Sequence, residues 1–454
     1  MKNGLWLAAL ACWGLGALSG CASHSDKTKE IRSALDAGQP GRALKLLNEQ
    51  LETDSEKQLP EKVSGDVPLW LLDRAMVLQQ LQSYQWSSRD LEASDKSVEM
   101  LDFSRNTAHD IGKYLFSDDS GPYKAPPYEK LMINTMNMVN YLARGDLQGA
   151  RVEARRLTVM QKYFKDHDPK NALSAPGSYL AGFTFEKSGQ YDEALRYYDE
   201  ALQYGQYPSL REPIRRLMPL SGYASPRLRK AAGLEDGEQL ARPDSAADAA
   251  QPGELLVIVS YGRVPEKVAR RIPIGLALTW ASGALEPGAS SQANALGAQG
   301  LVTWVNFPEL GKPRGQYDSP SFRLDGKAQP VDQIVAVDQE AKRAWDDVKG
   351  TVIASAITRL VARVAAGKGV EAAAGKDNAV LGLVLGLATQ ATLTAADTPD
   401  TRSWATLPAR MAFARVMLPA GTRTVQLQAR GANATKKIDI KPGGFAVVNL
   451  TVLQ

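Results

Sequence analysis

The sequence predicts an α+β protein: an N-terminal α-solenoid of helical hairpins, then a C-terminal antiparallel β-sandwich-like domain with an inserted helical hairpin. Two observations support this fold class. Apolar residues recur at helical spacing from about residue 30 to 233, as in Leu44, Leu47 and Leu51. From residue 254 onward, short β-rich runs alternate with Gly and Pro turns, which is typical of strands.

Composition limits the possible functions. The chain has 454 residues, of which 44% are hydrophobic and 23% charged, with a formal net charge of +4. This is the composition of a folded protein with two or three domains. It has no long Lys/Arg block, so we expect no nucleic-acid binding. The chain has only two Cys and three His, so few residues are available for a thiol nucleophile or a zinc site. We therefore expect no cofactor and no metal.

Residues 1–20 are predicted to be a lipoprotein signal peptide. Lys2 precedes an apolar run that is too short to span a bilayer and that ends at Leu18-Ser19-Gly20-Cys21. This tetrapeptide resembles the bacterial lipobox, in which the Cys is diacylated and the chain is cut before it. The resemblance implies that Cys21 becomes a lipidated amino terminus, with palmitate-type chains that hold it in a membrane.

The residues after Cys21 suggest which membrane this is. Ala22 stands where an Asp would resemble the inner-membrane retention signal. The expected location is therefore the outer membrane, on its periplasmic side. The polar residues 21–29 are predicted to form a short tether.

The helical domain, residues 30–233, contains a repeated turn. Gly stands five residues before Ala at Gly38 and Ala43, Gly145 and Ala150, and Gly189 and Ala194. Such a Gly ends one helix in a left-handed conformation, and the small Ala lets the next helix pack closely. The third copy resembles a tetratricopeptide repeat, because Gly182, Phe185, Tyr198 and Ala201 also match that spacing. The other copies match less well, so we expect an irregular tetratricopeptide-like array.

Aromatic residues gather around the third hairpin. Tyr179, Phe183, Tyr191 and Tyr198 are candidate partner-binding residues. Two interpretations stay open: a groove for a partner peptide, or the core of the hairpin.

Residues 234–253 lack periodicity and are predicted to be a linker to the β-rich domain, residues 254–454. Strands are expected at 254–260, 272–278, 300–307, 330–337, 409–417, 422–429, 436–440 and 446–453. The segment 418–450 resembles the hairpins of small surface β-sandwich modules of the PEGA type. That resemblance implies an antiparallel sandwich and no active site.

A helical insertion is expected at about residues 338–396. Its second part, Ala379–Ala396, has 18 residues without a charge and carries Gly382 and Gly386 at close-packing spacing. It is slightly short for a membrane span and contains Gln390. It fits a hairpin packed on the sandwich, with membrane contact or self-association as alternatives.

The sequence lacks the common catalytic motifs. The chain contains no Gly-x-Ser-x-Gly, Ser-x-x-Lys, His-Glu-x-x-His, Walker A or Gly-x-Gly-x-x-Gly pattern. Asp166-His167-Asp168 fits a solvated loop better than a metal site. We therefore expect no catalytic residues and a protein that is not an enzyme.

Several segments together resemble a family of uncharacterised proteobacterial lipoproteins with tetratricopeptide-like helices. They are the lipobox and residues 121–129, 146–157, 262–267 and 400–410. Arg402 and Trp404 look like the family's most distinctive local signature. They are candidate partner contacts, or an anchor that packs the sandwich edge. The resemblance implies location and architecture, but no activity.

These observations predict a lipid-anchored, periplasm-facing adaptor that binds an envelope protein and serves cell-envelope biogenesis. One alternative is an envelope enzyme or peptidoglycan-binding protein that uses carboxylates in a cleft between the halves. Another is an export or pore component that self-associates through Ala379–Ala396. The oligomeric state stays open.

Overall fold

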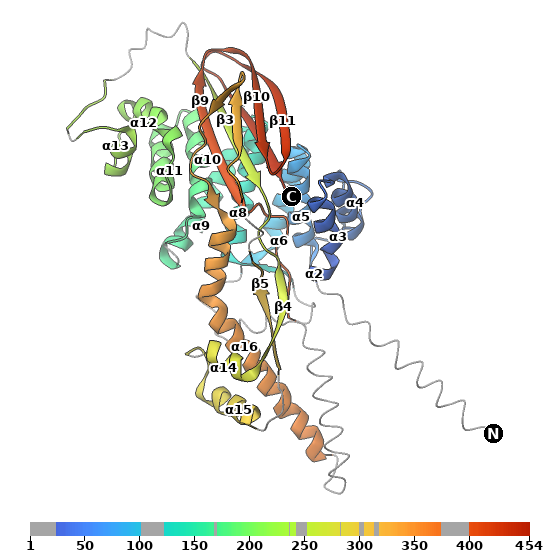
Figure 1. Ribbon diagram of the computed structural model, residues 1–454. Coiled ribbons are helices and arrows are strands. Elements are labelled where there is room, and N and C mark those ends of the chain that lie inside the picture. Colours follow the sequence, from blue (N-terminus) through green and yellow to red (C-terminus); the bar gives the residue numbers. More distant parts are fainter. Residues whose placement is uncertain are drawn as a thin grey trace.

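The computed structural model shows a mixed helical and sheet protein, in which a helical array packs against a β-sandwich and an arm projects from the body (Figure 1). The structure describes residues 24–100, 122–167, 170–235, 237–241, 252–281, 283–298, 304–312, 317–373 and 399–454. The expected α+β class is therefore confirmed at this level.

The helical array runs from residue 24 to residue 232. Its longer helices form hairpins of consecutive elements: α3 (Lys29–Asp36) with α4 (Pro40–Gln50), α5 (Val67–Gln80) with α6 (Tyr84–Ser97), α8 (Pro127–Ala143) with α9 (Leu147–His167), and α10 (Ser174–Lys187) with α11 (Tyr191–Tyr204). Shorter elements complete the array: α2 (His24–Lys27), β1 (Glu99–Met100), β2 (Lys124–Ala125), η2 (Pro208–Leu210), α12 (Arg211–Leu217), η3 (Met218–Leu220) and α13 (Pro226–Ala232).

The repeated turn is confirmed. Gly38, Gly145 and Gly189 have φ of 67°, 73° and 74°, in the left-handed region that Gly adopts at low cost. After each, the next backbone N–H donates to a carbonyl five residues back, for example from Gln190 to Phe185 at 2.9 Å. The α5–α6 hairpin has the same geometry at Gln82, with φ of 60°. The Gly pattern could not reveal it.

The β-sandwich has two four-stranded sheets, ordered β12-β3-β9-β8 and β11-β10-β6-β7. Their strands are β3 (Gly253–Tyr261), β6 (Ser321–Leu324), β7 (Lys327–Gln329), β8 (Val335–Ala336), β9 (Arg410–Leu418), β10 (Gly421–Ala429), β11 (Ala432–Ile440) and β12 (Phe445–Val452). The strict antiparallel expectation is wrong at one pair, because β12 runs parallel to β3. After β11 the chain crosses to the other sheet and enters beside β3 in the same direction.

The sheet β12-β3-β9-β8 is the middle layer of the protein. Strand β3 is buried along its whole length. Leu255, Val257 and Val259 pack against the second sheet, whereas Leu256 and Ile258 join the core of the helical array. Burial on both faces explains why this strand is a continuous apolar run.

The arm consists of the two-stranded ribbon β4 (Lys267–Pro273) and β5 (Trp304–Leu310) with α14 (Ile274–Trp280), α15 (Pro287–Ala298) and α16 (Val337–Ala373) (Figure 1). The expected strand 272–278 is wrong, because β4 ends at Pro273 and α14 follows directly. The expected helix from 338 is α16, while Ala379–Ala396 lies outside the described residues. Among the helices that the structure describes, none is long and apolar enough to cross a bilayer.

The predicted tether is corrected over residues 24–29. His24 begins α2, is 2% exposed, and its ring centroid lies 4.7 Å from that of Trp70. Burial lowers the pKa of His24 to about 3, assisted by Arg402 and Lys27. These residues therefore belong to the folded body. The signal peptide and Cys21 lie outside the described residues.

Candidate functional site between the helical array and the arm

The face of α10 that was expected to form a groove is covered by the sandwich. The ring of Tyr179 stacks on Phe413 of β9 at 4.6 Å, and Phe183 meets Phe445 of β12 edge-on at 5.5 Å. Tyr179, Phe183 and Tyr198 are all fully buried. The expectation of an open groove at these residues is therefore wrong, because the chain's own strands occupy it. Tyr191, at the start of α11, is half-buried and does not join them in one site.

A buried ion network lies beside these rings. Arg415 of β9 donates to Glu186 of α10 at 2.6 Å, to the Tyr198 hydroxyl at 2.7 Å, and to Glu254 of β3. Burial alone would raise the pKa of Glu186, but Arg415, Lys187 and Arg216 lower it well below its usual range. These interdomain carboxylates are closed off from solvent and bonded to cations. They give the expected carboxylate cleft no geometric support.

Arg402 and Trp404 anchor the segment before β9 to the helical array. Both side chains are about 1% exposed. The Trp404 indole N–H donates to the Leu72 carbonyl at 3.1 Å, and Arg402 pairs with Asp66 at 2.8 Å. The prediction that Arg402 and Trp404 contact a partner is therefore wrong for the surface of this structure, because neither side chain is accessible. The anchoring interpretation fits, although the contacts are to the helices and not to the sandwich edge.

Two buried carboxyl groups lie under this segment. Glu129 accepts hydrogen bonds from the Tyr123 hydroxyl, from the Tyr128 hydroxyl at 3.2 Å and from the Trp404 backbone N–H at 3.2 Å. Burial raises the pKa of Asp73 to about 7, against hydrogen bonds from Thr406 that lower it. One oxygen of Asp73 has no hydrogen-bond partner in the described part of the chain.

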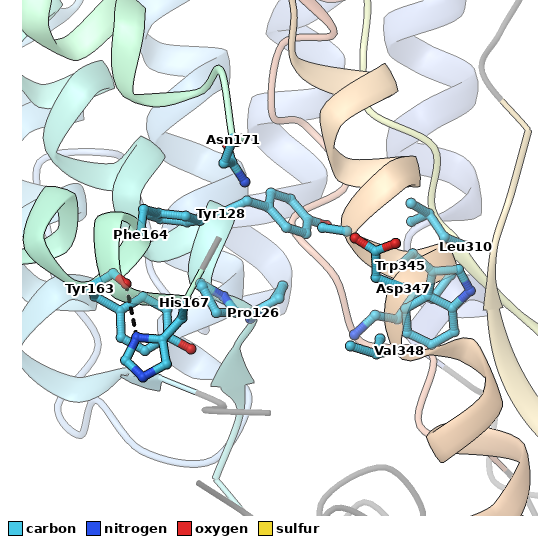
Figure 2. Close-up of a pocket in the computed structure, with 13 residues that line it drawn as sticks. Pro126, Tyr128, Tyr163, Phe164, His167, Asn171, Leu310, Trp345, Asp347 and Val348 are labelled. Carbon is cyan, nitrogen blue, oxygen red and sulfur yellow. Dashed lines mark hydrogen bonds between the residues drawn. The ribbon is translucent and has the colours of Figure 1, made fainter. Parts of the chain in front are cut away.

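A cavity of about 280 Å³ opens next to these groups, between the array and the arm. Figure 2 shows side chains of α9 on one side, those of α16 on the other, and Tyr128 between them. We call it the arm pocket. It is lined by Pro126, Pro127, Tyr128, Tyr163, Phe164, His167, Asn171, Lys267, Leu310, Ala344, Trp345, Asp347 and Val348.

Lys267 is the cation of the arm pocket. It is the first residue of β4 and is 6% exposed, with its Nζ 5.9 Å from the centroid of the Trp345 ring. Its ammonium makes no hydrogen bond or ion pair with the residues that the structure describes. Burial lowers the pKa of Lys267, while the negative charges of Glu129 and Asp400 raise it. A group that enters the pocket could therefore offer this ammonium an oxygen acceptor.

The rim of the arm pocket is polar and exposed. The Nδ1 of His167 lies 2.9 Å from the Tyr163 carbonyl (Figure 2), and Asp347 pairs with Arg343 at 3.1 Å. In the described ranges, no three His, Cys, Asp or Glu residues are grouped as a metal site requires. The arrangement suits the binding of an apolar group with one oxygen acceptor.

The sequence did not reveal the arm pocket, because five segments that are distant along the chain form it. Two of these segments have noticeable sequence features. Pro126 and Pro127 lie in the segment 121–129 of the family resemblance, and His167 stands between two Asp residues. Neither signal pointed to Lys267 or Trp345. Only the tertiary structure, which places residues of α16 across the pocket from those of α8 and α9, brings these residues together.

No protein-family model matches the chain, and no curated protein matches it. A solved structure described as MamA AMB-1 is similar, with 16% sequence identity, over 47% of this chain and 92% of that chain. The TM-score is 0.27. A score this low supports no conclusion about fold or function.

Proposed function

We propose that this protein is a lipid-anchored adaptor of the bacterial cell envelope, facing the periplasm, and that its partner protein docks in the arm pocket. The observation that carries the proposal is an aromatic-lined cavity with a buried ammonium that lacks an acceptor among the described residues. Buried aromatic residues dominate binding energy at protein interfaces, and an unpaired buried donor favours a ligand that supplies an acceptor.

The size of the arm pocket fits part of a protein better than a large metabolite. A water molecule takes about 30 Å³ of liquid, and small-molecule sites are usually about 300–1,000 Å³. At about 280 Å³, the pocket accommodates one or two apolar side chains. The apolar centre with a polar rim at His167 and Asp347 is also the usual arrangement of protein interfaces. A carbonyl or carboxylate oxygen of the docked segment would accept from Lys267.

The envelope location rests on the lipobox-like sequence at Leu18 to Cys21. Mass spectrometry of the amino-terminal peptide tests it directly, because acylation at Cys21 adds a defined mass. An unmodified peptide beginning upstream of Cys21 would refute the anchor.

Crosslinking capture from membranes tests the docking site. Val348→Glu places a charge in the arm pocket, and Val159→Glu makes the same change on the outer side of α9, where Val159 is 72% exposed. We expect the wild type and Val159→Glu to capture the same envelope protein and Val348→Glu to lose it. Equal capture by both variants would refute the site, and no specific capture by the wild type would refute the adaptor. Circular dichroism confirms that each variant is folded, and Tyr163→Ala provides a second pocket variant.

A further inference from the structure

Lys267 is a buried amine without a carboxylate partner. It is 6% exposed, and its ammonium makes no hydrogen bond or ion pair with the residues that the structure describes. Lys349, in the same arm, pairs instead with Glu309 of β5 at 2.8 Å. A buried ammonium without such a partner costs free energy, and loss of its proton removes most of that cost. Lys267 is therefore more available as a free amine than a lysine in water.

The charges around Lys267 act in both directions, and burial decides the net effect. Burial lowers the pKa of Lys267, the negative charges of Glu129 and Asp400 raise it, and the positive charge of Arg402 lowers it. Glu129 is itself 1% exposed, and burial raises its pKa. Both shifts favour the uncharged forms, which are a neutral amine on Lys267 and a neutral carboxyl on Glu129. The pair therefore supplies a nucleophilic nitrogen and a proton donor beside the same cavity.

The cavity next to this nitrogen is small and mainly apolar. Its lining includes the rings of Tyr128, Phe164 and Trp345 and the side chains of Leu310 and Val348. Small-molecule sites usually measure about 300–1,000 Å³, so a cavity of about 280 Å³ accepts a ligand of roughly one aromatic ring. A lysine that is desolvated in an apolar pocket is well suited to react with carbonyl compounds. The site therefore favours a carbonyl compound whose apolar part fills the cavity.

We propose that the Lys267 amine binds a small apolar aldehyde or ketone in the arm pocket as an imine. The nitrogen lone pair attacks the carbonyl carbon and forms the C–N bond, while the carbonyl oxygen takes up a proton and the nitrogen loses one. The resulting carbinolamine loses its hydroxyl group, together with the second nitrogen proton, as water. The reaction requires no oxidant or reductant, and hydrolysis of the imine reverses it.

Tyr128 and Glu129 can handle the protons of this reaction. Tyr128 lies between the side chains of α9 and those of α16 (Figure 2), and its hydroxyl donates to Glu129 at 3.2 Å. The Tyr123 hydroxyl also donates to this carboxyl group and holds it in place. A phenol in contact with a carboxyl group can give a proton to an oxygen and take one from a nitrogen. The site therefore supplies both the nucleophile and a route for its protons.

Reductive trapping on the purified full-length protein tests the imine. Benzaldehyde is added at a limiting concentration with sodium cyanoborohydride, which reduces an imine to a stable benzylamine, and peptide mass spectrometry locates the benzyl group. We expect Lys267 to be modified several-fold faster than Lys349, which also lies beside a tryptophan but is paired with Glu309. Lys162, which is exposed on α9, should react as slowly as Lys349. Modification of Lys267 no faster than of these two lysines would overturn the proposal.

Two further measurements show whether the reaction takes place in the arm pocket. Benzyl alcohol has the size of benzaldehyde but no carbonyl carbon, so an excess of it should slow the modification of Lys267 and leave that of Lys162 unchanged. Ala344→Trp adds bulk to the lining of the cavity and should also slow it, whereas Val159→Trp on the outer side of α9 should not. Circular dichroism confirms that both variants are folded. If neither the alcohol nor Ala344→Trp slows the modification, the cavity is not the binding site and the proposal fails.

Imine formation needs neither a partner protein nor the lipid anchor, so it stands apart from the proposed function. A benzyl group trapped on Lys267 occupies the cavity in which we propose that the partner docks, so the trapped protein should lose partner capture. Trapped protein that still captures the partner would contradict docking in the arm pocket and leave the imine intact.

Discussion

Tyr179 of α10 and Phe413 of β9 stack with their ring centroids 4.6 Å apart and their planes at 13°. One ring comes from the helical array and the other from the sandwich, so the two halves share one core. A helical array of this kind often uses such a face to bind other proteins. Here the face is buried against the chain's own middle sheet, so it is closed to a partner protein.

The shared core predicts cooperative unfolding. Phe413→Ala should lower the free energy of unfolding by about 3–5 kcal/mol, because it removes a fully buried ring between the halves. Helical circular dichroism and tryptophan fluorescence should still report one coincident denaturant transition. Val416→Ala, at a half-buried position of the same strand, should cost clearly less. Separate transitions for the two probes in the wild type would contradict the shared core.

Arg415 should be essential to the same interface. Arg415→Met leaves Glu186 and Glu254 buried without their main cation and should cost about 3–5 kcal/mol at pH 8. Without Arg415 the two carboxylates repel each other and their pKa values rise above those of the unfolded chain. The cost should therefore shrink as the pH falls from 8 to 5, where a proton can bind the pair.

Arg216→Met is the control for this network. Arg216 also pairs with Glu186, but its side chain is 37% exposed, so its removal should cost no more than about 1 kcal/mol. Denaturant titrations at pH 5, 6.5 and 8 measure both variants. A pH-independent cost for Arg415→Met would show that its role is packing and not charge.

Asp73 should make stability depend on pH in the opposite direction from an ordinary paired carboxylate. Its folded pKa is raised to about 7, above an unfolded value of about 3.9. The stability that it contributes is thus fully present below pH 4 and is lost as the pH rises to 7. Asp73→Asn should be nearly neutral at pH 4 and should stabilise the protein by up to about 4 kcal/mol at pH 8.

Thermal or denaturant unfolding across pH 4–8 checks this difference. Asp346→Asn, at an exposed position of α16, is the matched control for the substitution itself. A constant difference between Asp73→Asn and the wild type at all pH values would contradict the raised pKa.

The turn at Gln82 should tolerate glycine better than glutamine. Gln82 holds a left-handed conformation that costs a non-Gly residue about 1–2 kcal/mol, while Gly loses about 0.5–1 kcal/mol of extra chain entropy. Gln82→Gly should therefore stabilise the protein by roughly 0.5 kcal/mol. Gly189→Ala, in the equivalent turn, should destabilise it by roughly 1 kcal/mol. Equal effects of the two changes on the denaturation midpoint would contradict a shared turn geometry.

Local chemistry made much of this fold predictable. Gly38, Gly145 and Gly189 predict three hairpins, because each turn needs a residue in the left-handed conformation. The same turn at Gln82 cannot be predicted in this way, because Gln has no preference for that conformation. The sequence does not predict the helix α14, because Ile274–Trp280 follows β4 without a break. A short apolar run of this kind fits a strand as well as a helix. The lipidation at Cys21, the partner and the lack of enzymatic activity stay predictions.

The sequence by itself determined the α+β class, the switch from helices to strands near residue 253 and the left-handed turns, because these follow from periodicity and from backbone conformations within a few residues. Only the tertiary structure decided that Tyr179, Phe183 and Tyr198 face β9 and β12, and that Lys267 and Trp345 meet at the arm pocket. The physical reason is that an aromatic or apolar face predicts burial, but it does not predict which element of the chain will pack against it. The sheet that covers α10 begins more than sixty residues later in the chain. A contact between segments so far apart cannot be predicted from the residues around either one.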